Sequence, residues 1–199
     1  MITADEIKAL EDKAVEKGTS KLDLMENAGK QIAEVLKKKD LKGKRILVAA
    51  YHGNNGGDGF VAARELAATA EVEVLFIGEE ESLKSEAEIN LRRLEHEHVV
   101  QFITLEFIDF DDYDIIIDAL LGTGIEGSLR PRLQSTINAI NSTKAYKVSI
   151  DVPSGLNPDT GKVDDISVNA DLIISLHDLK KGLKDLKEKT VVVDIGIPK

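Results

Sequence analysis

Hydrophobic positions along the chain follow two patterns that alternate and predict helices and strands in turn. Near the N-terminus, apolar residues recur at helical spacing, which predicts one helix over about 3–18 and a second from Thr19 or Ser20 to the lysine run at 37–39. Thr3 and the glutamate three residues later form a capping-box pattern at the first helix start. Past residue 45, short and continuous apolar runs are typical of strands that are buried on both faces.

The rest of the chain alternates such strands with helical segments. Strands are predicted at 46–50, 72–77, 99–104, 115–120, 147–152, 172–175 and 190–193, with helices at about 60–67, 83–94 and 131–141. This alternation is typical of βαβ units. We therefore predict a single α/β domain over residues 1–199: a Rossmann-like, doubly wound, mostly parallel sheet with helices on both faces.

Composition excludes several classes of function. Lys and Arg number 26 and Asp and Glu number 36, and the net charge of −10 argues against a general nucleic-acid binder. The absence of cysteine excludes disulfide scaffolds, thiolate catalysis and zinc ribbons, and it fits a cytoplasmic location. No apolar run approaches the roughly 18–20 residues of a membrane span, and the first residues lack a signal-peptide pattern. We expect a soluble protein without nucleic-acid or membrane partners.

Ligands of open α/β sheets bind beyond the carboxyl ends of the strands, and three predicted strand ends carry unusual residues. The first is 53–59, Gly-Asn-Asn-Gly-Gly-Asp-Gly, whose glycines permit positive φ and close backbone approach. Its amides, leading into a helix, can form an anion-binding nest. It matches neither the dinucleotide fingerprint nor a P-loop. The alternative interpretation is a tight turn with Asp58 as a helix cap.

The second strand end carries Asp118, which closes an apolar strand. A buried carboxylate is costly without a partner, so Asp118 needs a cation, a hydrogen-bond donor or a solvated cleft. A structural salt bridge is the alternative interpretation. The segment 122–128 that follows is rich in backbone amides and can cradle a phosphate, with Arg130 close in sequence to add positive charge.

The third strand end carries Asp151 and Ser154 on either side of Pro153, whose ring fixes the backbone and so gives both side chains defined directions. No histidine is close to Ser154 in sequence, which argues against a Ser-His-Asp triad. His52 and His177 are left without a role at this stage, because a lone histidine in a loop is more often structural.

Five segments now occur in an order that resembles a known family. They are Met25–Gly29, Gly53–Gly59, Asp118–Gly124, Asp151–Leu156 and Val193–Pro198. Together they resemble the NAD(P)H-hydrate epimerase family over essentially the whole chain. The Asn-Asn-Gly-Gly-Asp run is the most specific of them.

The resemblance implies an isomerase that interconverts the R and S epimers of hydrated NADH or NADPH. This repair reaction serves a separate or fused NAD(P)H-hydrate dehydratase, and the sequence leaves open whether this chain is free-standing or part of such a fusion. A homodimer is also implied. In support of a dimer, we expect apolar residues of the second helix to exceed what the sheet can cover, namely Leu22, Met25, Ile32 and Leu36.

The resemblance also implies which residues form the site. Those implied to bind the substrate are Asn54, Asn55, Gly56, Gly57, Asp58, Gly122, Thr123, Gly124, Ile125, Glu126, Gly127, Ser128 and Asp151. A potassium ion (K+) is implied at Asn55, Asp118 and Ser154. Their oxygen ligands are hard donors that suit an alkali cation.

The implied substrate suggests the mechanism. C6 of the hydrated ring is a carbinolamine carbon, so N1 can expel hydroxide to give a planar iminium, and water can return to either face. This needs a group that gives and takes a proton. Asp151 is our candidate catalytic residue, because it ends a strand over the expected pocket; plain positioning of the substrate is the competing role.

Two alternatives and two departures from the family pattern remain. One alternative is a non-catalytic nucleotide-binding module that acts through protein contacts, although its ligand residues are all present. The other, a nucleotide-dependent oxidoreductase, lacks the dinucleotide fingerprint. His52 stands where the family commonly has proline, and Leu179 replaces the proline of a more usual Pro-Lys-x-Gly-Leu segment. Both departures affect the expected pocket rim.

Overall fold

The computed structural model describes residues 1–124 and 127–197. Its centre is a seven-stranded sheet with the order β3-β2-β1-β4-β5-β6-β7, in which every neighbouring pair is parallel. The strands are β1 (Arg45–Ala50), β2 (Glu71–Phe76), β3 (Gln101–Ile103), β4 (Ile115–Ala119), β5 (Tyr146–Ile150), β6 (Leu172–Leu176) and β7 (Thr190–Val193). The predicted α/β fold is confirmed.

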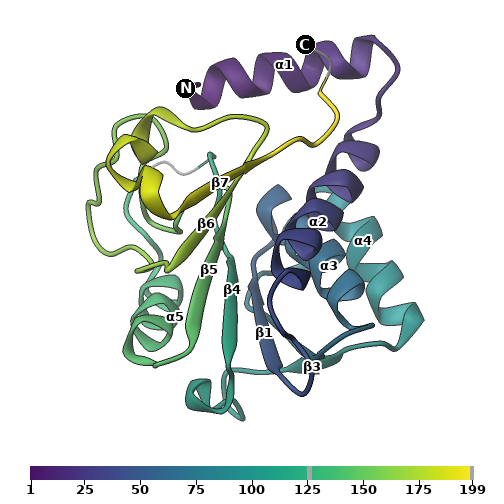
Figure 1. Ribbon diagram of the computed structural model, residues 1–199, viewed down its shortest axis with the longest axis vertical. Coiled ribbons are helices and arrows are strands. Elements are labelled where there is room, and N and C mark those ends of the chain that lie inside the picture. The colour runs from purple at the N-terminus through teal and green to yellow at the C-terminus, as the bar shows by residue number, and fades with distance from the viewer. Residues whose placement is uncertain (125–126, 198–199) are drawn as a thin grey trace.

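Helices cover both faces of the sheet. The α-helices are α1 (Ala4–Glu16), α2 (Lys21–Lys37), α3 (Asn54–Leu66), α4 (Ser85–Glu97) and α5 (Pro131–Ser142), and the short 3-10 segments are η1 (Glu80–Ser82), η2 (Phe110–Asp112) and η3 (Lys181–Lys189). Figure 1 shows α2, α3 and α4 on one face and α5 on the other, whereas α1 lies across the end of the sheet. None of the helices within the described ranges is long and apolar enough to cross a membrane.

Two capping boxes fix where the first helices begin. The Thr3 hydroxyl accepts from the Glu6 amide at 3.1 Å, and the Glu6 carboxylate accepts from the Thr3 amide at 2.7 Å. Ser20 and Asp23 repeat the arrangement at the start of α2, so the second helix is capped by Ser20 and not by Thr19. Each such cap stabilises a helix by about 0.5–2 kcal/mol.

The apolar face of α2 is buried within the single chain. Ile32 and Leu36 have no exposed surface and Met25 is also buried, whereas Leu22 is half-buried. The expectation that these residues exceed what the sheet covers is therefore wrong, because α3 and the sheet already bury them.

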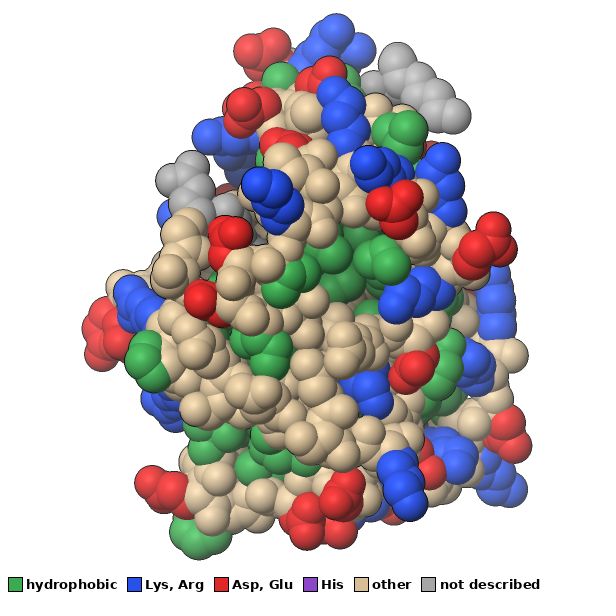
Figure 2. All heavy atoms as spheres, turned by 90° about the vertical axis from the view of Figure 1, so that its left-hand side faces the viewer, with side chains coloured by type: hydrophobic (Ala, Val, Ile, Leu, Met, Phe, Trp, Pro, Cys, Tyr) green, Lys and Arg blue, Asp and Glu red, His purple; other side chains and the backbone are tan. Residues whose placement is uncertain are grey.

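The opposite, α5-bearing side of the molecule has a mixed surface. Figure 2 looks onto the face that lies at the left in Figure 1; its hydrophobic side chains form several separate patches, with charged side chains spread around them. This face offers no broad, continuous apolar surface.

Candidate functional site

Three strand ends lie next to each other at one edge of the sheet. Strand β4 pairs with β1 on one side and with β5 on the other, and Asp118 is opposite Ser149 in the register. The segments that follow β1, β4 and β5 therefore start from one edge.

The glycine-rich segment is helical and not a loop. Helix α3 begins at Asn54, so residues 54–59 form its first turns, and none of its glycines has a positive φ. They are needed for close packing instead. A Cβ on Gly56 would lie 1.8 Å from the Tyr51 carbonyl oxygen, and one on Gly59 would lie 2.5 Å from the Ala119 Cβ. The expected use of positive φ is wrong, and the close approach of this backbone to a ligand stays a prediction.

Asp118 is wholly buried and is satisfied by hydrogen bonds. Its carboxylate accepts from the Ser149 hydroxyl at 2.7 Å, from the Ser154 amide at 2.9 Å, from the Ser154 hydroxyl and from the Leu120 amide. Burial raises the pKa of Asp118, and the bonds from Ser154 and Ser149 oppose that shift. No Lys or Arg within the described ranges pairs with it, so the salt-bridge alternative is wrong.

Asn55 is the second residue of α3 and connects the start of the helix to this network. Its Nδ2 donates to the Leu121 carbonyl at 2.9 Å, and the Leu121 amide donates to the Ser154 hydroxyl at 2.8 Å. The buried Asn55 Oδ1 has no hydrogen-bond partner among the described residues. Asn55, Asp118 and Ser154 are thus joined through Leu121, and they leave one buried carbonyl oxygen without a partner.

Asp151 follows β5 in a backbone conformation that few residues adopt. Its φ is +66°, in the left-handed region, which costs roughly 1–2 kcal/mol for a residue other than glycine. Its Oδ1 accepts from the Leu176 amide at 3.0 Å and also from the Nζ of Lys180. Strain of this kind occurs where the surrounding structure holds a functional side chain in place.

Lys180 is the most important residue that sequence reasoning missed. It is fully buried, pairs with Asp151 and donates to the Leu176 carbonyl at 2.6 Å. Lysine is almost never fully buried without a partner. In the sequence, Lys180 is one of two adjacent lysines in the segment 179–183, and no local pattern marks it as buried.

Asp58 lies one turn beyond Asn55 on the same face of α3. It is only 8% exposed, and in the described part of the chain no hydrogen-bond donor or cation pairs with its carboxyl group. Burial raises the pKa of Asp58 well above its usual value, and the charges of Asp151 and Glu11 raise it further, against an opposing effect of Lys180. The alternative that Asp58 caps the helix is wrong, because Gly53 is the N-cap residue.

Helix α1 brings Glu11 toward this cluster. Figure 1 shows α1 lying across the end of the sheet, where backbone hydrogen bonds fix its start: the Ile2 amide donates to the Leu179 carbonyl at 2.9 Å, and the Lys181 amide donates to the Ile2 carbonyl at 3.0 Å. Burial, followed by the charge of Asp151, raises the pKa of Glu11. No sequence signal distinguished Glu11 from the solvent-facing acids of this helix.

The other residues implied to bind the substrate lie around the buried network of Asn55, Asp118 and Ser154 and are mostly exposed. Asn54 is exposed at the first position of α3, Thr123 is half-buried, and Gly124 and Ser128 are exposed. A Cβ on Gly122 would lie 3.3 Å from the Asn55 Cβ, so the chain just after β4 lies against the start of α3. Gly127 is exposed with a φ of +76°. Ile125 and Glu126 lie outside the described residues.

His52 and His177 have structural surroundings. The His52 ring lies beside the Tyr51 ring with centroids 3.8 Å apart, and burial is the main cause that lowers the pKa of His52. His177 donates its amide to the Val193 carbonyl at 2.8 Å and so helps to join β6 to β7.

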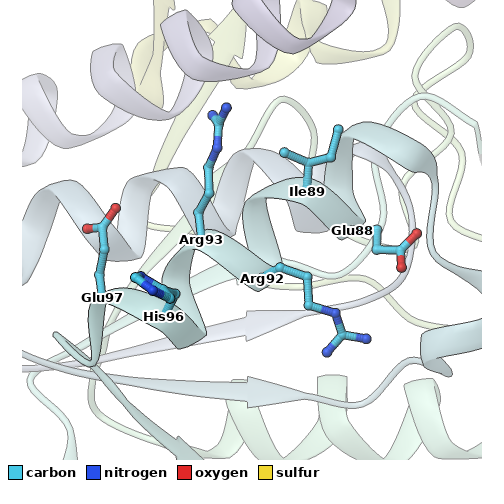
Figure 3. A pocket seen from close by; sticks show the side chains of 6 residues that line it. All are labelled: Glu88, Ile89, Arg92, Arg93, His96 and Glu97. Atoms are coloured by element: carbon cyan, nitrogen blue, oxygen red, sulfur yellow. The ribbon is translucent and has the colours of Figure 1, made fainter.

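A hollow of about 470 Å³ lies elsewhere, on the outer side of α4 (Figure 3). It is lined by Glu88, Ile89, Arg92, Arg93, His96 and Glu97. Its arginines are already engaged: Arg92 pairs with Glu80 at 2.6 Å, and Arg93 pairs with Glu26 at 2.7 Å. We place the functional site at the strand ends and not here, because the strand ends carry the buried Asp118 and Asp151, and Asp151 also has a strained backbone.

Comparison with known proteins identifies the family of this chain. The family described as YjeF-related protein N-terminus matches residues 21–182. An NAD(P)H-hydrate epimerase from Nitrosopumilus maritimus is 40% identical over 205 residues, covering 99% of this chain and 95% of that protein. The chain belongs to the NAD(P)H-hydrate epimerase family. The resemblance inferred from the five ordered segments is confirmed, and the family is one of isomerases.

Two further matches are a longer relative and a solved structure of lower sequence identity. A bifunctional NAD(P)H-hydrate repair enzyme from Methanothermobacter thermautotrophicus is 43% identical over 195 residues, covering 91% of this chain but only 37% of that protein. The chain thus spans little more than a third of that relative. The crystal structure of yeast ynu0 superposes with a TM-score of 0.84, covering 98% of this chain and 87% of that one, at 23% identity. That likeness shows the fold.

Proposed function

We propose that this chain is an isomerase that interconverts the R and S epimers of hydrated NADH and NADPH. The observation that carries the proposal is the buried Asp151–Lys180 pair, which lies at the carboxyl edge of the sheet in a family of NAD(P)H-hydrate epimerases. Titratable groups with buried partners at such an edge are typical of active sites.

The reaction requires no redox step. The N1 lone pair expels the C6 hydroxyl of the hydrated ring, with a proton, as water. The planar iminium that results accepts water on either face, with loss of a proton. The chain must therefore hold the ring, exclude bulk water and exchange a proton at the C6 oxygen.

In this proposal Asp151 exchanges the proton. Its Oδ1 is occupied by the Leu176 amide and Lys180, whereas no donor among the described residues reaches Oδ2, which is left for the substrate hydroxyl. Lys180 orients the carboxylate and compensates its charge. A role in positioning the substrate alone predicts loss of affinity and not of turnover when Asp151 is changed.

We further propose that K+ binds at Asn55, Asp118 and Ser154. The donor set fits: the buried Asn55 Oδ1 has no partner among the described residues, and the buried Asp118 has hydrogen-bond donors but no cationic side chain. These are hard oxygen ligands. The ion would supply positive charge near the substrate phosphates, and the three residues would orient Leu121 and the adjacent amide-rich segment.

Substrate binding is assigned to the segments around this network. The start of α3, residues 54–58, offers backbone amides at a helix N-terminus, where an anion is stabilised by the helix dipole. The second segment, 122–128, is assigned on the family resemblance, and its first residue, Gly122, lies against Asn55 after the end of β4. Asp151 completes the set from the end of β5.

The partners are proposals as well. Relatives named as bifunctional repair enzymes motivate a functional coupling to an NAD(P)H-hydrate dehydratase, separate from this chain or fused to it. A homodimer and a cytoplasmic location follow from the family resemblance and the cysteine-free composition, and each stays a prediction.

The proposal is tested by incubating the purified chain with a single epimer of hydrated NADH and separating the two epimers by chromatography. An epimerase brings them to their equilibrium ratio faster than buffer does. A non-catalytic binding module would instead bind the hydrate, as measured by calorimetry, and the epimers would interconvert only at the rate seen in buffer. That outcome would contradict the proposal and favour the binding module.

A further inference from the structure

Asp58 is a buried carboxyl group that the mechanism above does not use. It lies on α3 within the electrostatic reach of Asp151 and Lys180, yet no donor or cation among the described residues pairs with it. An ionised carboxylate at such a position is costly. The neutral acid is the form that this environment favours.

Asp58 and Asp151 have different surroundings. Asp151 lies against the ammonium group of Lys180, and its Oδ1 accepts a hydrogen bond from the Leu176 amide. Asp58 has only burial and the like charges of Asp151 and Glu11 around it, with Lys180 as the opposing charge. One carboxyl group paired with a buried cation and a second one without a partner have the different surroundings that an acid–base pair requires.

We propose that Asp58 is a second proton-exchanging group of the epimerase, acting on one face of the iminium while Asp151 acts on the other. This inference rests on the proposed function. It assigns one carboxyl group to each epimer, because the hydroxyl groups of the two epimers lie on opposite faces of the ring. A single carboxyl group on one face could not exchange protons equally well with both.

The proton balance of this scheme closes. Asp58 in its acid form donates a proton to the C6 hydroxyl on its face; the C–O bond breaks, its electron pair leaves with the oxygen as water, and N1 supplies the pair that forms the C=N bond. A water on the other face then adds to C6 and gives its proton to the Asp151 carboxylate. Asp58 ends ionised and Asp151 ends protonated.

That final state is the starting state for the opposite epimer. For repeated turnover in one direction, a proton must return from Asp151 to Asp58. Both residues retain a small exposed fraction, so exchange with water resets them. The groups that bias this exchange come from several elements: Glu11 of α1 and Asp151 after β5 favour protonation of Asp58, and Lys180, between β6 and η3, opposes it.

The experiment compares Asp58→Asn with a matched control, Asp111→Asn, in water enriched in oxygen-18. Asp111 is exposed in η2, which precedes β4 and so lies at the opposite edge of the sheet. Each variant is given each pure epimer in a separate reaction, and both inversion at C6 and incorporation of oxygen-18 are followed by chromatography with mass spectrometry.

For Asp58→Asn we expect kcat for epimerisation to fall by about a hundredfold or more, with little change in the affinity for the hydrate. One epimer should still exchange its oxygen without inversion, because Asp151 can serve its own face as acid and then as base. Asp111→Asn should match the wild type. Wild-type kcat in Asp58→Asn, or a loss of affinity alone, would overturn the proposal, as would equal loss of exchange from both epimers.

A second measurement is independent of activity and of the proposed substrate. At neutral pH, the infrared spectrum of the wild type should contain the carbonyl band of a protonated carboxylic acid at Asp58. The spectrum of Asp58→Asn should lack this band, so that it remains in the difference between the two. A carboxylate band at Asp58 instead would overturn the inference even if the chain proves to be an epimerase. If the wild type shows the acid band but epimerises nothing, the proposed function fails and the protonation state of Asp58 stands.

Discussion

Asp151 has a backbone conformation that limits how it can be tested. Asparagine tolerates the left-handed region better than alanine does, so Asp151→Asn keeps the local geometry and removes the titratable group. We expect the variant to bind the hydrate while kcat falls by about a hundredfold to ten-thousandfold. Steady-state kinetics that separate kcat from KM check this, and an unchanged kcat would leave Asp151 as a positioning residue.

The same substitution leaves Lys180 as an uncompensated buried charge, and this predicts a separate effect on stability. Removing one partner of a buried ion pair costs roughly 3–5 kcal/mol. The double variant with Asp151→Asn and Lys180→Met should recover most of that loss but none of the turnover. Denaturant unfolding measures the free energies, and equal stability of the single and double variants would contradict the pairing.

Asn55 gives the cleaner test of the K+ site. Asp118 holds four hydrogen bonds of the fold, whereas Asn55 Oδ1 holds none among the described residues. Changing the cation of the buffer from choline to K+ should raise the Tm of the wild type. A ligand at about 100 times its Kd adds about 2.7 kcal/mol to the free energy of unfolding. Asn55→Ala should lose this response and Asn138→Ala, exposed on α5, should keep it. Equal responses in all three proteins would exclude Asn55 as a ligand.

The raised pKa of Asp58 also predicts how the stability of the fold depends on pH. Its pKa is raised in the folded state, so the folded chain holds this proton more tightly than the unfolded chain, whose value is near 3.9. The contribution to stability is present below the unfolded value and is lost as pH rises through the folded one. The stability of Asp58→Asn relative to the wild type should therefore increase with pH. A constant difference from acid to alkaline pH would contradict the raised pKa.

At the scale of elements, the close contact of α2 with α3 positions both Asn55 and Asp58. A Cβ on Gly29 would lie 2.3 Å from the Val61 Cβ and 2.9 Å from the Ala62 amide nitrogen. A glycine-to-alanine change inside a helix usually stabilises it by about 1 kcal/mol. Here Gly29→Ala should instead destabilise the fold by about 1–3 kcal/mol, because the added methyl group overpacks a fixed backbone.

The control for this prediction is Gly53→Ala, because an added Cβ there meets nothing within 4 Å and the φ of −84° is ordinary. Thermal unfolding of both variants measures the difference, at about 2–4 °C per kcal/mol for a chain of this size. A Gly29→Ala variant as stable as Gly53→Ala would show that α2 and α3 can separate without cost.

Local patterns determined the elements well and the glycine segment poorly. The capping box at Thr3 and the apolar run of β1 are local signals, and both elements lie where they were predicted. Glycines at 56, 57 and 59 suggested a loop because glycine disfavours helices. Tertiary contacts with Tyr51, Met25 and Ala119 override that preference, and no local pattern contains those contacts.

At the scale of the whole molecule, the sequence predicted the strand-end acids but not the groups that surround them. Asp118 and Asp151 were visible because an acid that ends an apolar strand is unusual. Lys180 and Glu11 reach the site from segments far along the chain, through the Ile2 bridge to the Lys180 segment. Such convergence depends on the order of strands and on the path of α1, which residue patterns do not contain.

The homodimer is a prediction at this scale. The apolar face of α2 does not support it, because Met25, Ile32 and Leu36 are buried within one chain. The dimer therefore rests on the family resemblance. Light scattering at micromolar concentration should give twice the mass of 21.7 kDa for one chain. A mass equal to one chain would remove the dimer from the account.

The central claim is that the buried groups at the carboxyl edge of the sheet make this chain an epimerase. The most direct measurement is the initial rate at which one pure epimer of hydrated NADH is converted into the other, compared among the wild type, Asp111→Asn, Asp151→Asn and buffer alone. We predict that the first two rates are equal and far above that of buffer, and that the rate of Asp151→Asn falls by at least a hundredfold. A wild-type rate equal to that of buffer would contradict the account.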